Sequence, residues 1–356
     1  MNSRDFKGRP FYINDAYEPK AQVLILHGIC EHGLRYSDLS HFLKKNRFSS
    51  AFTDHPGHGL FCPSGPEMQA VTDSYSNNDD FNRLSASFLH YRNTETSHKF
   101  LQECNIIGSR LNLREIADYQ IDFLNFLYQE NIFRRDLPLI IFGQSLGGLI
   151  CSMVTHKLKD RDIRPEGVIL YSPAFGPVIR PPRGKGLFYK AAGKAETFFL
   201  NKSKKACQKN TLFKLMVLNP LLKLNPSRGS EWSVKYISDL EEENHLFDCD
   251  PLIHRKLSMH FLFSILQSMV ENVNKAAKFP CPFFTAYGTD DRIVDSRATD
   301  VFVENYLKSN IGNKTTIKRV ENFMPHELHK SSMKSEVFTE TAEWINMLID
   351  RKPQDG

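Results

Sequence analysis

Ser145 lies in a sequence pattern that is typical of a catalytic nucleophile. Gly143 and Gly147 flank it at the G-x-S-x-G spacing, between an apolar run at 138–142 and another that begins at residue 149. A strand, a sharp turn and a helix are the context of a nucleophile elbow, where the serine hydroxyl projects from a strained turn. The positive end of the following helix favours negative charge beside that hydroxyl. The pattern predicts acyl transfer through a covalent serine intermediate.

A glycine-containing loop early in the chain is the candidate oxyanion hole. It spans residues 27–33, with the sequence HGICEHG, and follows the apolar run 23–26. Such loops donate one backbone N–H to the oxyanion, and the residue after the nucleophile donates a second. The expected donors are the N–H groups of Ile29 and Leu146. Gly28 has no side chain, which lets this backbone approach closely.

Two later segments offer the acid and the base of a catalytic triad. The apolar run 283–287 is followed by three carboxylates, Asp290, Asp291 and Asp295, and the run 315–320 by two histidines, His326 and His329. Spacing alone leaves both choices open. The chain order serine, carboxylate, histidine is that of the α/β-hydrolase fold.

The elements that would hold these residues alternate along the chain. Short apolar runs separated by helical patterns are typical of a mainly parallel sheet with helices on both faces. The predicted class is α/β, with an α/β-hydrolase fold that carries an inserted helical cap. Strands are expected at 23–26, 138–142, 168–171, 283–287 and 315–320, and helices of period 3.6 through 113–128 and 338–349.

Two segments interrupt this alternation. In the polar stretch at about 62–111, the runs at 76–80 and 94–97 are typical of loops, and we expect a second lid, a partner-binding loop or a disordered insertion. The stretch 176–250 begins with three prolines and separates two predicted strands. We therefore expect a hydrolase core in two parts, 1–175 and 251–356, with a basic helical cap at 176–250 between them.

The predicted cap carries a concentrated positive charge. Residues 180–228 contain twelve lysines and arginines and a single acid, Glu196, a balance of +11, whereas the whole chain carries +5. Because phenylalanines and leucines are interspersed among these cations, the cap is predicted to dock on an anionic membrane; the alternative is a solvated basic surface. No motif for reading nucleic acid accompanies the charge, so no nucleic-acid partner is expected.

Composition sets further expectations. The N-terminal residues form no apolar run typical of a signal peptide, and no apolar stretch reaches the ~18 uninterrupted residues of a spanning helix. The seven cysteines are scattered, which favours a reducing compartment over a disulfide framework or a zinc site. We expect a cytoplasmic protein with peripheral membrane contact through the cap, and no metal or other cofactor.

Six short motifs follow one another in an order that known hydrolases share. They are His27-Gly28-x-x-Glu31-His32, Asp54-His55-Pro56-Gly57-His58-Gly59, Gly143-x-Ser145-x-Gly147-Gly148, Asp250-Pro251-Leu252, Gly288-x-x-Asp291 and His326-x-x-His329. With these motifs the chain resembles the monoacylglycerol lipase and lysophospholipase branch of the α/β-hydrolases. The resemblance covers residues from about 10 to 65, from 112 to 175 and from 245 to the end.

The resemblance implies roles that spacing leaves undecided. Its Gly-x-x-Asp pattern selects Asp291 as the acid, and its His-x-x-His pattern makes His326 the base. It also implies a polar end of the site, where glycerol is held, formed by Glu31, Arg35 and His329. As alternatives, Glu31 and Arg35 form a structural ion pair and His329 braces the loop.

Other residues near these motifs are expected to be structural. The histidines at 27, 32, 55 and 58 are predicted to hydrogen-bond to the backbone, and Asp54 with residues 57–59 to build a tight turn. Two features depart from the family pattern. Ile29 replaces a small residue, which would narrow the entrance of the acyl tunnel, and the stretch 62–111 is longer than the family needs.

We predict a serine carboxylester hydrolase that acts on single-chain lipids, monoacylglycerol or lysophospholipid, through an acyl-enzyme intermediate. Within hydrolases, the alternatives are an acyl-thioesterase, a small-ester esterase and a serine aminopeptidase on the same fold. From a different class, the alternative is a catalytically inactive binding protein. Such relatives usually lose a triad residue, whereas Ser145, Asp291 and His326 are all present here.

Overall fold

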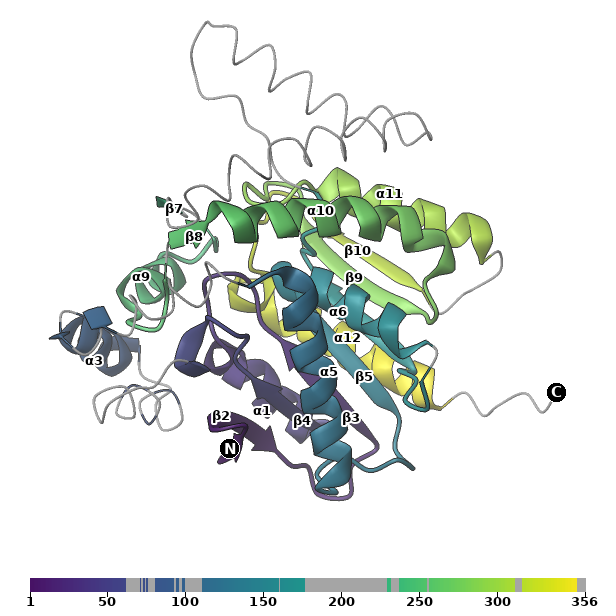
Figure 1. The fold of residues 1–356 in the computed structure, drawn as a ribbon, viewed down its shortest axis with the longest axis horizontal. Coiled ribbons are helices and arrows are strands. Elements are labelled where there is room, and N and C mark those ends of the chain that lie inside the picture. The colour runs from purple at the N-terminus through teal and green to yellow at the C-terminus, as the bar shows by residue number, and fades with distance from the viewer. Residues whose placement is uncertain are drawn as a thin grey trace, which may run out of the picture.

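A mostly parallel sheet forms the centre of the molecule (Figure 1). The computed structural model describes residues 1–61, 111–159, 161–176, 229–231, 237–254, 256–310 and 316–350, together with 71, 73, 75, 81–92, 94, 95, 98 and 99. The sheet has eight strands in the order β1-β2-β4-β3-β5-β6-β9-β10. Strand β2 pairs antiparallel with β1 and β4, and the other neighbours are parallel.

The strands of this sheet are β1 (Asn2–Phe6), β2 (Arg9–Asn14), β3 (Ala21–Leu26), β4 (Phe48–Thr53), β5 (Leu139–Gln144), β6 (Gly167–Tyr171), β9 (Phe283–Gly288) and β10 (Ile317–Glu321). A separate antiparallel pair is formed by β7 (Gly229–Glu231) and β8 (Lys256–Ser258). The helices are α1 (Ser37–Lys45), α3 (Phe81–Arg92), α5 (Leu113–Gln129), α6 (Leu146–Leu158), α9 (Glu241–Cys249), α10 (Met259–Lys275), α11 (Ser296–Ser309) and α12 (Lys334–Ile349). Single 3-10 turns are η1 (Gly33–Tyr36), η2 (Gly59–Phe61), η3 (Ala276–Lys278) and η4 (Leu328–Lys330).

Helices cover both faces of the sheet because its central strands are apolar on both sides. In β3, Leu24 and Leu26 join a cluster with α5, α6, α10 and α11, whereas Val23 and Ile25 join a cluster with α1 and α12. Successive side chains of a strand point to opposite faces, so one strand contributes side chains to both apolar clusters. These layers confirm the predicted α/β-hydrolase fold class.

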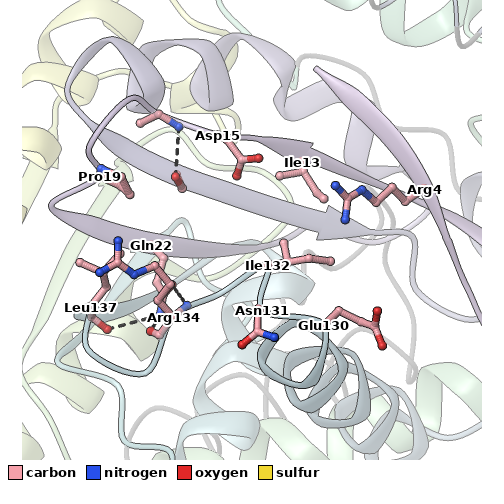
Figure 2. Close-up of a pocket in the computed structure, with 12 residues that line it drawn as sticks. Arg4, Ile13, Asp15, Pro19, Gln22, Glu130, Asn131, Ile132, Arg134 and Leu137 are labelled. Atoms are coloured by element: carbon pink, nitrogen blue, oxygen red, sulfur yellow. Dashed lines mark hydrogen bonds between the residues drawn. The ribbon is translucent and has the colours of Figure 1, made fainter.

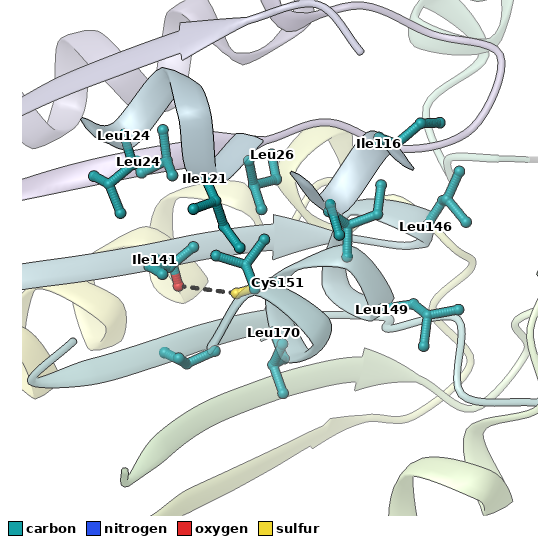
Figure 3. Packing of buried hydrophobic residues seen from close by; sticks show 14 of the residues in the cluster. Leu24, Leu26, Ile116, Ile121, Leu124, Ile141, Leu146, Leu149, Cys151 and Leu170 are labelled. Carbon is teal, nitrogen blue, oxygen red and sulfur yellow. Dashed lines mark hydrogen bonds between the residues drawn. The ribbon is translucent and has the colours of Figure 1, made fainter. Parts of the chain in front are cut away.

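Helix α6 is held firmly against the sheet (Figure 3). Leu149 and Cys151 from this helix pack among Ile121 of α5, Ile141 of β5 and Leu170 of β6, all fully buried. Burying each large aliphatic side chain contributes roughly 1.5–3 kcal/mol. This packing fixes the position of the turn that precedes α6.

The strands that carry the site motifs were predictable, and those near the N-terminus were not. All five expected strands and both expected helices are present. The hairpin of β1 and β2 was missed because β1, the edge strand, is mostly polar and exposed, and because β2 has only a short apolar run after Arg9 and Pro10. Strand β4 was missed because serines interrupt its apolar run. In the structure, Ser50 is buried and hydrogen-bonds to Ser40 at 2.8 Å.

Much of the two predicted insertions lies outside the described residues, namely 62–70, 100–110, 177–228 and 232–236. The loop predicted at 76–80 is also outside them, and the predicted domain boundaries stay predictions. Within the insertion at 62–111, α3 packs against α9, and Phe88 is completely buried. No helix among the described residues is both long and apolar enough to cross a membrane.

A surface pocket of about 340 Å³ lies at the amino ends of the central strands (Figure 2). Gln22 at the start of β3 and Leu137 just before β5 help to line it, with Arg4, Asp15 and Glu130. Ser145 follows the opposite, carboxyl end of β5. This pocket is therefore separated from Ser145 by the length of the sheet.

Candidate active site

Ser145 occupies a strained turn between β5 and α6. Its backbone angles are φ 53° and ψ −119°, a combination that residues other than glycine rarely adopt. Backbone hydrogen bonds hold it there: its N–H donates to Tyr171 O at 2.9 Å, and its carbonyl accepts from Gly148 N at 3.0 Å, Leu149 N at 3.3 Å and Ala174 N at 2.8 Å. Strain persists where the surroundings over-determine the conformation, as they do here. The hydroxyl does not cap the helix that it precedes.

The positions two residues to either side of Ser145 have no room for a side chain, so glycine is required there. A Cβ added to Gly147 would lie 2.1 Å from the carbonyl oxygen of Leu26, and one added to Gly143 would lie 2.3 Å from Gly147 O. Both contacts are with backbone, which cannot rotate away. Close approach of α6 to β3 and β5 thus explains the G-x-S-x-G spacing.

Asp291 and His326 form a buried hydrogen-bonded pair. Asp291 Oδ2 lies 2.7 Å from His326 Nδ1, and Asp291 Oδ1 accepts from the backbone N–H groups of Ile293 at 2.8 Å and Val294 at 3.0 Å. Burial lowers the pKa of His326, but the charge of Asp291 and its hydrogen bond outweigh burial and raise that pKa. With Nδ1–H donating to the carboxylate, Nε2 is the nitrogen left to act as a base.

The other two candidate carboxylates have different partners. Asp290 pairs with Arg292 at 3.0 Å, and Asp295 caps α11 and pairs with Arg297 at 2.8 Å. Asp291 is thus the carboxylate that lies beside His326, and it is the one that the Gly-x-x-Asp resemblance selects; its catalytic role stays a prediction.

The loop of residues 27–33 is held by a buried carboxylate. Glu31 accepts from the backbone N–H of Gly28, from Tyr36 Oη at 2.7 Å and from Arg35 Nη1 at 2.7 Å. Tyr36 Oη also lies 3.2 Å from Gln144 Oε1, immediately before Ser145. Through Tyr36, Glu31 therefore connects the candidate oxyanion loop to the end of β5, which precedes Ser145.

Arg35 connects the same loop to the candidate base. Its guanidinium makes two hydrogen bonds to Glu327, each 2.8 Å long, and lies over the ring of Phe247 at 4.7 Å. Glu327 directly follows His326. We name the buried group Glu31, Arg35 and Glu327 the ion triad. Since Glu31 and Arg35 both have partners in the protein, the structure supports their alternative role as an ion pair, and their head-group role stays a prediction.

His329 differs from His326 because no hydrogen bond from the described residues holds its ring. It is 1% exposed and stacks on Tyr36 with ring centroids 4.7 Å apart and planes inclined by 6°. Neither ring nitrogen has a hydrogen-bond partner within the part of the chain that the structure describes. Burial lowers the pKa of His329 to about 3. The ring is therefore neutral at pH 7, and its one donor and one acceptor have no partner among the described residues.

The structural expectations for the nearby loop residues are largely met. Asp54 accepts from the N–H groups of Gly33 at 2.7 Å and Leu60 at 2.6 Å, and so closes the tight turn. Three of the four loop histidines hydrogen-bond to backbone as predicted. His32 does not: its Nε2 lies 2.9 Å from a carboxylate oxygen of Asp250, which also accepts from Tyr75.

Sequence reasoning missed several residues of this site. Glu327, Tyr36 and Gln144 carried no motif of their own. The only available signal for Glu327 was an acidic residue inside the His-x-x-His pattern, and its partner Arg35 lies 292 residues away in the chain. The four cysteines among the described residues are buried, and lie at positions 30, 151, 249 and 281.

The sheet order, the serine elbow and the buried Asp–His pair define this protein as a hydrolase of the α/β-hydrolase fold. A family model for serine aminopeptidases of the S33 family matches residues 17–101 and 97–331. The chain belongs to this family.

Individual relatives are more distant. The chain is 25% identical over 346 residues to an uncharacterised abhydrolase domain-containing protein of Dictyostelium discoideum, covering 95% of this chain and 28% of that protein. It is 23% identical over 334 residues to the monoglyceride lipase of Mus musculus, covering 93% and 84% of the two chains. The crystal structure of a Paleococcus ferrophilus monoacylglycerol lipase superposes with a TM-score of 0.59 at 18% identity, covering 96% of this chain and 99% of that chain. The resemblance drawn from the motifs is confirmed at the level of fold and family.

Proposed function

We propose that this protein is a serine hydrolase that cleaves the carboxylic ester of a single-chain lipid. The observation that carries the proposal is the pairing of a strained, glycine-flanked Ser145 with a buried Asp291–His326 hydrogen bond in the chain order of this fold. Ser145, Asp291 and His326 are the proposed triad. The N–H groups of Ile29 and Leu146 are the proposed oxyanion donors.

The proposed reaction has two halves. Ser145 Oγ attacks the ester carbonyl while His326 Nε2 takes the serine proton, and the two backbone N–H groups bind the oxyanion of the tetrahedral intermediate. His326 then gives that proton to the departing alcohol, which leaves an acyl-enzyme. In the second half His326 takes a proton from water, the resulting hydroxide attacks the acyl carbon, and the proton returns to Ser145 as the fatty acid leaves. Asp291 keeps the histidine in the correct tautomer throughout.

Three features support a lipid ester as the substrate. The mouse relative is named a monoglyceride lipase and the P. ferrophilus structure a monoacylglycerol lipase. The sequence motifs resemble the same branch. Leu146 and Ile29, which flank the proposed oxyanion hole, pack into or against the large apolar cluster of the molecule.

Among the described residues, the polar groups around the base favour a neutral head group over a phosphate. Three carboxylates lie in this group, those of Glu31, Glu327 and Asp291. The guanidinium of Arg35 is already bound to two of them. A phosphate placed there would meet like charge. Neutral His329 offers one donor and one acceptor, which suits hydroxyl groups. We therefore propose a monoacylglycerol in preference to a lysophospholipid.

A hydrolysis screen tests the proposal. Purified protein would be offered monoacylglycerols, lysophospholipids, acyl-thioesters and aminoacyl amides of matched acyl length, with Ser145→Ala as the control. We expect release of fatty acid from monoacylglycerol, and a loss on the order of a million-fold in Ser145→Ala, as for other triad serines. Covalent labelling by a fluorophosphonate should disappear in the same variant.

The alternatives are outcomes of the same screen. Preferential cleavage of the aminoacyl amide would favour the aminopeptidase activity that the family description names. Preferential cleavage of the thioester or of a short ester would favour those activities. No labelling and no hydrolysis by the wild-type protein would indicate an inactive binding protein, and the proposal would then be abandoned.

A further inference from the structure

Two buried histidines outside the proposed triad hold the candidate oxyanion loop. His27 Nδ1 lies 2.8 Å from Gly28 O, and His27 Nε2 accepts from the backbone N–H of His55 at 2.8 Å. In return, His55 Nε2 lies 2.9 Å from His27 O, and its Nδ1 lies 2.9 Å from Gln120 Nε2 of α5. The two rings are 3.9 Å apart between centroids and no more than 1% exposed.

The partners of these rings determine which nitrogen carries the proton. A backbone N–H can only donate, so His27 Nε2 accepts from His55 and the proton of His27 sits on Nδ1. That proton is then donated to Gly28 O. A backbone carbonyl can only accept, so His55 carries its proton on Nε2, and its Nδ1 accepts from Gln120. Both imidazoles are neutral and use both nitrogens, and a second proton on either ring would break one of these bonds.

This arrangement fixes both sides of Gly28. Its N–H is held by the Glu31 carboxylate and its C=O by His27. The peptide bond between Gly28 and Ile29 is planar and trans, so the N–H of Ile29 points opposite to the carbonyl of Gly28. A group that fixes the direction of that carbonyl also fixes the direction of the Ile29 N–H.

We propose that His27 is a positioning residue that aims the Ile29 N–H at the oxyanion, and that His55 and Gln120 hold His27 in the required tautomer. The inference rests on the proposed function, because it assigns a cause to the geometry of the proposed oxyanion hole. His27 does not touch the substrate. It acts through the Gly28–Ile29 peptide.

The test compares two substitutions at one position. His27→Asn retains an N–H donor near the place of Nδ1 but loses the Nε2 acceptor, whereas His27→Leu removes both groups at similar volume. On a short soluble ester, we expect His27→Leu to lower kcat by about 10- to 100-fold with KM nearly unchanged, because an oxyanion contact forms mainly in the transition state. Loss of a whole oxyanion donor costs about 100- to 1,000-fold, which sets the upper limit. His27→Asn should recover at least half of the lost kcat on a logarithmic scale.

His58→Leu is the matched control. His58 is also about 1% exposed and lies 5.5 Å from His27 between ring centroids, but its Nδ1 bonds to Pro56 O and not to the loop. We expect it to lower thermal stability as His27→Leu does while leaving kcat within about threefold of wild type. Equal kcat losses in His27→Leu and His58→Leu, or no recovery by Asn, would overturn the proposal. Failure of wild type to hydrolyse any ester would instead overturn the proposed function, so the two failures are distinguishable.

Discussion

At the scale of single residues, the proposed chemistry depends on the protonation of His326. The charge of Asp291 and its hydrogen bond raise the pKa of this histidine against the effect of burial. A general base must be neutral, so activity should be full at high pH and should fall as pH drops through this raised pKa. The acid limb is thus expected above pH 6.5, the ordinary pKa of histidine.

Asp291→Asn tests this assignment. Without the carboxylate, the pKa of His326 should decrease, and the acid limb of kcat should move to lower pH. The plateau should fall about 10⁴-fold because the imidazole adopts the wrong tautomer. The measurement is a pH profile of kcat on a soluble ester, with Asp290→Asn as a control that leaves both limb and plateau in place. An unchanged acid limb in Asp291→Asn would mean that another group supplies the base.

At the scale of elements, the ion triad joins three segments that are distant in sequence. It links the loop after β3, the turn before η4 and, through Tyr36, the end of β5. Removing one partner of a buried ion pair leaves an unpaired charge and typically costs about 3–5 kcal/mol. We expect Arg35→Met to lower the free energy of unfolding by about that amount, measured by urea denaturation.

An exposed pair provides the comparison. Arg114 bonds to Glu271 on the surface with its side chain 57% exposed. Arg114→Met should cost less than about 1 kcal/mol. If Arg35→Met also left stability unchanged but raised KM for monoacylglycerol, Arg35 would be a head-group contact rather than a structural cation.

The proposed catalytic triad and the ion triad together show which contacts could be predicted from the sequence and which could not. Ser145, Asp291 and His326 lie in short motifs at strand ends, and the carboxyl ends of parallel strands meet at one edge of a sheet. The contact between Asp291 and His326, and the expected place of Ser145 at the same edge, therefore followed from strand order. The partnership of Arg35 with Glu327 depends on how two loops pack, and neither loop has a period or a motif that encodes it. Strand β4 was hidden for a related reason, because its buried Ser50 finds its hydrogen-bond partner, Ser40 of α1, only after folding.

At the scale of the whole molecule, buried neutral histidines should make the fold sensitive to acid. Burial is the main cause that lowers the pKa of His27, His55 and His58, in the case of His55 to about 4. Below the ordinary value of 6.5 the unfolded chain takes up protons that the folded chain does not, so stability falls as pH decreases from 6.5 toward the lowered values. Each such histidine should lower the free energy of unfolding by about 2 kcal/mol between pH 6.5 and pH 5.

Urea denaturation at pH 7 and pH 5 measures this loss. His58→Gln removes one of these buried rings, and the decrease in its free energy of unfolding between the two pH values should be smaller than that of wild type by about 2 kcal/mol. His90→Gln is the control, since His90 is exposed. Identical losses in wild type and His58→Gln would show that His58 is not held neutral by burial.

The charge distribution of the whole chain predicts contact with membranes. Residues 180–228, which lie outside the described part of the structure, carry twelve cations against one acid, whereas the whole chain carries only +5. Each lysine or arginine near an anionic surface contributes about 1 kcal/mol, so four or five on one side would give measurable binding at low salt. Salt should weaken that binding because it screens exposed charge.

Charge reversal separates membrane binding from a general effect of charge. Changing Lys202, Lys204, Lys205 and Lys209 to Glu should abolish sedimentation with anionic vesicles and lower activity on vesicle-borne monoacylglycerol, but not on a short soluble ester. The matched control reverses four exposed lysines of the core that lie near the amino ends of the strands, away from Ser145: Lys20, Lys44, Lys45 and Lys278. Because both variants carry the same net charge, only the position of the change differs. Equal loss of vesicle binding in the two variants, or no binding by wild type at low salt, would show that the basic segment is a solvated surface.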